Sequence, residues 1–167
     1  LHQRMLKPEF KTIEARKLVG MQITTNLQDD NSTAFLWQGF MPIKSNIKNI
    51  VNEDLYSFQE YDAFVAITEF NETSPFRKWA AIEVENYNTI PAGMETIEIP
   101  SGEYAVFTHK GPTSTFVHTA QQIFNFWLPN SGLLLDDRPQ FEIMGEKYKG
   151  AEHPLSEEEI WVPIKKA

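Results

Sequence analysis

The chain has 167 residues, 41% of them hydrophobic, and a formal net charge of −8. This length and composition suffice for one buried core, whereas the negative charge and the scattered Lys and Arg residues argue against direct binding to nucleic acid. No apolar run is long enough for a membrane helix or a secretory signal, so we expect a cytoplasmic protein. The absence of cysteine excludes disulfides and thiolate metal sites.

The first half of the chain predicts a strand, a helix and two further strands. Residues 12–25 carry alternating apolar side chains, which is typical of a half-buried strand. An aromatic stripe with Trp37 and Phe40 follows and ends at a proline, as a helix would. Residues 63–70 and 78–85 are rich in strand-forming side chains, and residues 86–93 form a polar joint to the second half.

The second half predicts the same elements in the same order. Residues 96–109 form an extended run, and the stop signal at residues 129–132 ends a helix that begins after Pro112. Further strands are predicted at 140–146 and 159–164. One face of the predicted helix carries apolar side chains at helical spacing. These are Phe116, Ala120, Ile123, Phe124 and Trp127.

Two short matches indicate an internal repeat. The sequence TIE occurs at 12–14 and at 96–98, and the helical motifs LWQGFMP and IFNFWLP occur at 36–42 and 123–129. We therefore predict a single α+β domain over residues 1–167, with repeat halves of about 10–86 and 94–166. The halves would be related by pseudo-two-fold symmetry, with helices on the outer face and antiparallel sheets forming a ligand cleft between them.

The second half also resembles GyrI-like domains. The resemblance rests on METIEIPSGEYA at 94–105, FWLPNSG at 126–132, FEI at 141–143 and EIWVPI at 159–164. The family comprises the effector-binding parts of AraC-type and MerR-type multidrug regulators, the gyrase-inhibitor proteins, and free-standing relatives without a DNA-binding part. This chain resembles the last group, which implies a small organic ligand and, as possible partners, a transcription regulator or gyrase.

The resemblance also implies particular site residues. In multidrug-sensing members a buried glutamate at the floor of an aromatic pocket attracts lipophilic cations, and the strand motif implies that this residue is Glu142. The family often has a tyrosine two residues later, where this chain has Met144, which implies a more apolar or differently shaped pocket. Phe116 occupies a position that lines the pocket in the multidrug sensors, although its place on the apolar helix face favours a core residue instead.

The alternation of side chains along the strands supplies an independent argument for the site. Glu142 interrupts an apolar strand, and a solvent-facing position is its simplest alternative. In the last strand the isoleucines and valine form a core face, so Glu159 and Trp161 share the opposite face. By the same alternation Trp79 faces away from the helix in its strand and is the predicted mate of Trp161. Tyr104, on the strand before the Gly-Pro turn, is a further candidate.

These residues favour a protein that binds a lipophilic, cationic organic ligand against aromatic side chains and a central glutamate. The alternative is a hydrolase of small electrophilic xenobiotics in which Glu142 or Glu159 acts as general base. A third hypothesis, haem carriage, lacks a well-placed histidine ligand. We expect no cofactor and no metal, because the histidines have no metal-ligand spacing. They stand at His2, His109, His118 and His153.

Overall fold

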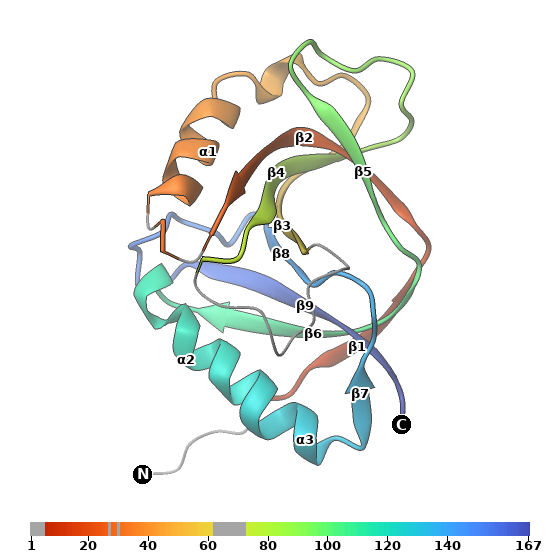
Figure 1. Ribbon diagram of the computed structural model, residues 1–167, viewed down its shortest axis with the longest axis vertical. Coiled ribbons are helices and arrows are strands. Elements are labelled where there is room, and N and C mark those ends of the chain that lie inside the picture. The colour runs from red at the N-terminus through yellow and green to blue at the C-terminus, as the bar shows by residue number, and fades with distance from the viewer. Residues whose placement is uncertain (1–5, 27, 30, 62–72) are drawn as a thin grey trace. The chain divides into compact units, whose positions relative to one another are not determined.

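The computed structural model describes residues 6–26, 28–29, 31–61 and 73–167 (Figure 1). The chain folds into two compact units, each held together by contacts among its own residues. The central unit is Arg16–Ile99, and the terminal unit combines Leu1–Ala15 with Pro100–Ala167. Each unit contains its own group of antiparallel strands and its own apolar core.

The central unit is a four-stranded antiparallel sheet with one helix on it. Its sheet has the order β3-β4-β2-β5, and α1 packs on β2 and β4 (Figure 1). The helix buries Leu36 and Phe40, which are one turn apart on one face, and it ends just before Pro42. The elements are β2 (Arg16–Thr25), α1 (Ser32–Phe40), a short 3-10 turn (Lys44–Asn46), β3 (Ile50–Tyr61), β4 (Phe76–Val84) and β5 (Glu95–Ile99).

The antiparallel strands of the terminal unit have the order β1-β6-β9-β8, and the short strand β7 pairs with the end of β9. A continuous helical stretch after β6 buries Ile123 in the core of this unit. The strands are β1 (Glu9–Ile13), β6 (Gly102–Lys110), β7 (Leu133–Leu135), β8 (Phe141–Met144) and β9 (Glu157–Lys166). The helical stretch comprises a 3-10 turn (Thr113–Thr115), α2 (Phe116–Gln121), a π-helical segment (Gln122–Trp127) and α3 (Leu128–Asn130).

The predicted α+β class is confirmed, whereas the predicted duplication of a strand, helix, strand, strand unit stays a prediction. The predicted strands at 78–85, 140–146 and 159–164 correspond to β4, β8 and β9. The prediction for 63–70 lies outside the described residues. The pseudo-two-fold relation of the halves and the cleft between them stay predictions.

The first predicted strand of each half was wrong in one respect, because each is broken in two. Residues 12–25 divide into β1 and β2, and residues 96–109 divide into β5 and β6. β5 pairs with β2, whereas β1 pairs with β6. The units therefore differ from the predicted halves, about 10–86 and 94–166, by an exchange of their first strands. Alternation of side chains continues across a short bend, so periodicity alone did not reveal the breaks.

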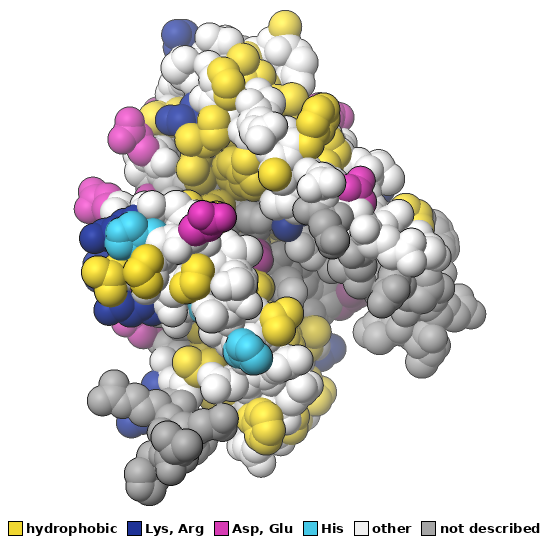
Figure 2. All heavy atoms as spheres, turned by 90° about the vertical axis from the view of Figure 1, so that its left-hand side faces the viewer, with side chains coloured by type: hydrophobic (Ala, Val, Ile, Leu, Met, Phe, Trp, Pro, Cys, Tyr) yellow, Lys and Arg dark blue, Asp and Glu magenta, His cyan; other side chains and the backbone are white. Residues whose placement is uncertain are grey.

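Both helical regions expose apolar side chains on their outer surface, and Figure 2 shows such side chains at the surface of the part that carries α1. Phe35 of α1 and Phe126 of the terminal unit are 71% and 65% exposed.

Strand β3 was not predicted, since Asn52, Glu53 and Asp54 interrupt its apolar pattern. None of the helices in the described ranges is long and apolar enough to cross a membrane.

Gly20 allows the backbones of β2 and β4 to approach closely. It lies opposite Ala81, and a Cβ atom at position 20 would meet the carbonyl oxygen of Ala80 and lie 2.6 Å from the Cα atom of Ala81. Because backbone atoms cannot move aside as a side chain can, only glycine fits at this point of the sheet.

We predict that Gly20→Ala lowers the free energy of unfolding by about 3 kcal/mol, the upper part of the usual cost of overpacking. Urea unfolding followed by far-ultraviolet circular dichroism measures the change. Gly39→Ala is the matched control, because the nearest atom to a Cβ there is a flexible methionine carbon at 3.9 Å. Alanine in that exposed helical position should stabilise by about 0.5–1 kcal/mol. Equal effects at the two sites would contradict the close approach.

Candidate functional site

The pairing register of the terminal sheet determines which side chains share a face, since residues directly opposite in antiparallel strands project to the same side. Trp161 lies opposite Val106 and Phe141, and Glu159 lies opposite Thr108 and Ile143. The helix-side core instead holds the alternate residues of the same strands. These are Ala105, Phe107, Ile160, Val162 and Ile164. The sheet therefore has an apolar helix side and a second face, which we call the aromatic face.

The aromatic face contains three packed rings, Tyr104, Phe141 and Trp161. The ring of Phe141 stacks on that of Trp161, with centroids 5.3 Å apart and planes at 19°. Tyr104 meets both edge-on, at 5.5 Å from Phe141 and 5.7 Å from Trp161. All three are almost fully buried. Such pairs each contribute about 0.5–1.5 kcal/mol beyond the burial of their area, so the rings form a rigid group.

Glu159 places a carboxylate beside these rings. Its Oε1 atom accepts a hydrogen bond of 3.1 Å from the indole Nε1 of Trp161. The side chain is half-buried, and it forms no ion pair with any residue in the described part of the chain. A single indole N–H neutralises no charge, so this carboxylate retains its capacity to attract a cation.

Two basic side chains lie over the rings. The Nζ atom of Lys11 is 5.4 Å from the ring centroid of Trp161, and the Cζ atom of Arg138 is 4.5 Å from that of Tyr104. Lys11 belongs to β1, where it pairs with Tyr104 and so projects to the aromatic face. Both distances are within the range in which a cation is attracted to an aromatic ring.

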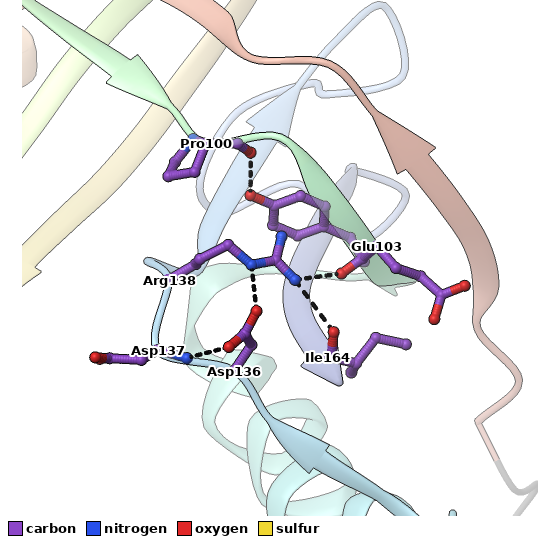
Figure 3. Close-up of polar contacts among 7 residues, drawn as sticks. Pro100, Glu103, Asp136, Asp137, Arg138 and Ile164 are labelled. Atoms are coloured by element: carbon purple, nitrogen blue, oxygen red, sulfur yellow. Dashed lines mark hydrogen bonds and ion pairs between the residues drawn. The ribbon is translucent and has the colours of Figure 1, made fainter. Parts of the chain in front are cut away.

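Arg138 is fixed by a set of hydrogen bonds that Figure 3 shows. Its Nη2 atom donates to the carbonyl oxygens of Glu103 and Ile164, at 2.8 and 3.1 Å, and its Nε atom donates to Asp136 at 2.6 Å. The guanidinium also lies against Gly102, where a Cβ atom would meet its Nη1 atom. Arg138 thereby connects the ends of β6 and β9 and covers one side of Tyr104.

Tyr104 and Asp136 complete this arrangement (Figure 3). The hydroxyl of Tyr104 donates a hydrogen bond of 2.8 Å to the carbonyl oxygen of Pro100, just before β6. Hydrogen bonds from Arg138 and from the backbone N–H of Asp137 lower the pKa of Asp136. The ring of Tyr104 is therefore held at its hydroxyl end and across its face.

The central unit carries a similar but neutralised arrangement. Trp79 donates from Nε1 to Oε1 of Glu60 at 2.8 Å, and Phe58 lies opposite Trp79 in the register. Arg77 also binds this carboxylate, with its Nε atom 3.2 Å from the same oxygen. Glu60 in the central unit is therefore already ion-paired within the chain, whereas Glu159 forms no such pair with a residue in the described ranges.

A buried tyrosine lies on the same face of the central sheet, which is the side away from α1. The hydroxyl of Tyr56 accepts a hydrogen bond from Arg16 at 2.9 Å and donates one to Glu83 at 3.2 Å. Burial raises the pKa of Tyr56 far above its usual value. The predicted orientation of Trp79 away from the helix is confirmed, because its neighbours Ala80 and Ile82 form the core with α1.

The structure brings together three of the predicted site residues, Trp161, Glu159 and Tyr104, and separates the others. Glu142 pairs with Ile160, so its side chain projects to the opposite face from Trp161. Glu142 and Trp161 were both predicted to bind the ligand, but the register, which depends on pairing across strands, puts their side chains on opposite faces of the terminal sheet. Phe116 packs on the helix-side core, and Trp79 belongs to the central unit.

Sequence reasoning missed Phe141, Lys11 and Glu60 as members of these arrangements. Phe141 belongs to the strand motif, but it alternates with Glu142, the residue of β8 that was predicted to bind the ligand. No sequence pattern links Lys11 to Trp161 or Glu60 to Trp79. In the described ranges, no group of three or more His, Asp or Glu side chains is arranged to hold a metal ion.

Comparison with known proteins connects these features to one family. The profile of the GyrI-like small molecule binding domain matches residues 6–165. The transcriptional regulator BrlR of Pseudomonas aeruginosa is 26% identical over 98% of the chain, and the chain spans 58% of the length of that regulator.

Solved structures share the fold. SAV2435 bound to tetraphenylphosphonium has a TM-score of 0.71 at 15% identity, with 96% of this chain and 94% of that chain covered. The EcmrR C-terminal domain has a TM-score of 0.67 at 17% identity, covering 98% of this chain and all of that one. A hydrolase from Listeria innocua has a TM-score of 0.60 at 13% identity, with 98% and 94% covered.

The ion pair of Asp136 with Arg138 predicts a particular pH dependence. Since the folded pKa of Asp136 is lowered from its ordinary value of 3.8, its stabilising contribution is complete above that pH and disappears as the pH falls through the folded pKa. Asp136→Asn should therefore lower Tm at pH 7 but lower it less as the pH falls below 3.8.

Thermal scans of both proteins from pH 7 downward measure this difference. Asp137→Asn is the control, because Asp137 contributes only its backbone N–H to the arrangement. A Tm difference between wild type and Asp136→Asn that stays constant with pH would show that the carboxylate charge does not stabilise Arg138.

Proposed function

Because the chain belongs to the GyrI-like small molecule binding domain family, we propose that it binds a lipophilic organic cation at the aromatic face of the terminal unit. Glu159 is the carboxylate that attracts the charge, and the ring group of Trp161 with its neighbours provides the apolar surface. Aromatic ring faces attract cations by about 0.5–2 kcal/mol, and a carboxylate adds a stronger, longer-range attraction.

The observation that carries this proposal is the state of Glu159. It is the acid that hydrogen-bonds Trp161 on the aromatic face, and it has no basic partner in the described ranges of the chain. Glu60, beside Trp79, is already paired with Arg77. Glu142 projects to the other face of its sheet. Of the three glutamates, Glu159 alone combines aromatic neighbours with an unneutralised charge.

The relatives support the class of ligand and the biological setting. Tetraphenylphosphonium, which is bound to SAV2435, is a lipophilic cation. BrlR is a transcriptional regulator, although this chain spans only 58% of its length. We propose that ligand occupancy here is linked to transcription regulation, in the cytoplasm, with a regulator or gyrase as the candidate partner protein.

The alternative function is hydrolysis of a small electrophile, with Glu159 directing water as general base. A structural neighbour from Listeria innocua is named a hydrolase, but at 13% identity the likeness extends to the fold alone. The same carboxylate would act in both functions, so recovery of the ligand distinguishes them.

We predict that tetraphenylphosphonium binds the wild-type protein saturably and that Glu159→Gln weakens binding about tenfold, or ~1.4 kcal/mol, because the charge–charge attraction is lost. Isothermal titration calorimetry measures the affinity, and mass spectrometry of the recovered compound tests for turnover. Glu142→Gln is the matched control, with the same chemical change on the other face of the sheet, and should bind like wild type.

Tetraphenylborate provides the second control, because it has the same shape and the opposite charge and should not bind. Equal loss in the two glutamine variants, or equal binding of the cation and the anion, would contradict the assignment of Glu159. A consumed electrophile, released as hydrolysed product, would favour the hydrolase instead.

A further inference from the structure

The aromatic face already holds two cations of the chain, and they are held very differently. Arg138 over Tyr104 makes three hydrogen bonds, two of them to backbone carbonyls, and its side chain is only 13% exposed. Lys11 over Trp161 has a side chain that is 40% exposed. Its nearest acidic partner, Glu9, is itself 81% exposed and lies 3.9 Å away.

This difference makes one cation fixed and the other exchangeable. Displacing Arg138 would break three hydrogen bonds in which the donor is charged, and such bonds are stronger than those between neutral groups. Displacing Lys11 breaks only a solvent-exposed ion pair and one cation–π contact, both of which are weak at exposed sites. The backbone of β1 need not move, because a lysine side chain has several rotatable bonds.

We propose that Lys11 is a specificity-determining residue that occupies the cation position on Trp161 until a ligand replaces it. This inference rests on the proposed function. A competing ligand must bind the ring better than the lysine ammonium does. Lys11 is tethered beside the ring by its own strand, so it competes well against free small cations that are as strongly hydrated as its ammonium.

Bulky cations with delocalised charge lose less hydration when they contact an aromatic ring, and they also bury apolar surface. Such ligands replace Lys11 readily, whereas small alkylammonium ions do not. The ammonium of Lys11 thus raises the threshold for binding and selects lipophilic cations. Once displaced, it returns to solvent near Glu9 and leaves Glu159 with the ligand.

The test compares tetraphenylphosphonium and tetramethylammonium in wild type, Lys11→Met and Lys11→Arg by isothermal titration calorimetry. Lys11→Met removes the competitor and should tighten tetraphenylphosphonium binding about three- to tenfold, the range that a cation–π contact of moderate strength implies. The gain for tetramethylammonium should be at least as large. Lys11→Arg keeps a cation at the ring, so its affinity for the two ligands should equal that of wild type or be lower.

Lys149→Met is the control for net charge, because it removes one exposed positive charge in the loop between β8 and β9 of the same unit. Near-ultraviolet circular dichroism verifies that each variant retains its aromatic packing. If Glu159-dependent binding of tetraphenylphosphonium is present in wild type but Lys11→Met gains no more affinity than Lys149→Met, the role of Lys11 is wrong and the proposed function stands. If no variant binds either cation, the proposed function fails and this inference fails with it.

Discussion

The antiparallel register of β6, β9 and β8 is the constraint on which the site depends. It places Trp161 opposite Phe141 and next to the strand of Tyr104, so three rings pack on one side of the sheet. A shift of one residue in β8 would replace Phe141 by Glu142 beside the indole and so disrupt the packing of the rings. The helix-side core fixes this register, because Ile160 and its alternate neighbours must face the helix.

Electrostatics then distinguish two arrangements that are otherwise alike. In both units a tryptophan of the middle strand donates its indole N–H to a glutamate and lies opposite a phenylalanine. Arg77 neutralises the central glutamate, and no described residue forms such an ion pair with Glu159. Local charge, rather than the fold or the aromatic content, therefore decides which of the two carboxylates can attract an external cation.

The sequence was informative where periodicity acts within one strand and uninformative where strands must be paired. Alternation correctly separated Trp161 from Ile160 and Trp79 from Ile82. It could not decide which face of β8 joins which face of β9, so Glu142 was assigned to the wrong side. The contact between Lys11 and Trp161 joins residues far apart in sequence and has no local signal, and β3 was hidden by its polar residues.

The burial of the three rings limits how a ligand can gain affinity. Since Tyr104, Phe141 and Trp161 expose almost no surface, covering them further supplies little hydrophobic free energy. Affinity must come from the charge of Glu159, from the exchange of one cation for another on the indole, and from the ligand's own apolar surface. An exchange of cations conserves the contact with the ring, so the difference in hydration between ligand and ammonium determines selectivity. In the proposed function, the aromatic face would therefore distinguish cations by their hydration more than by their shape.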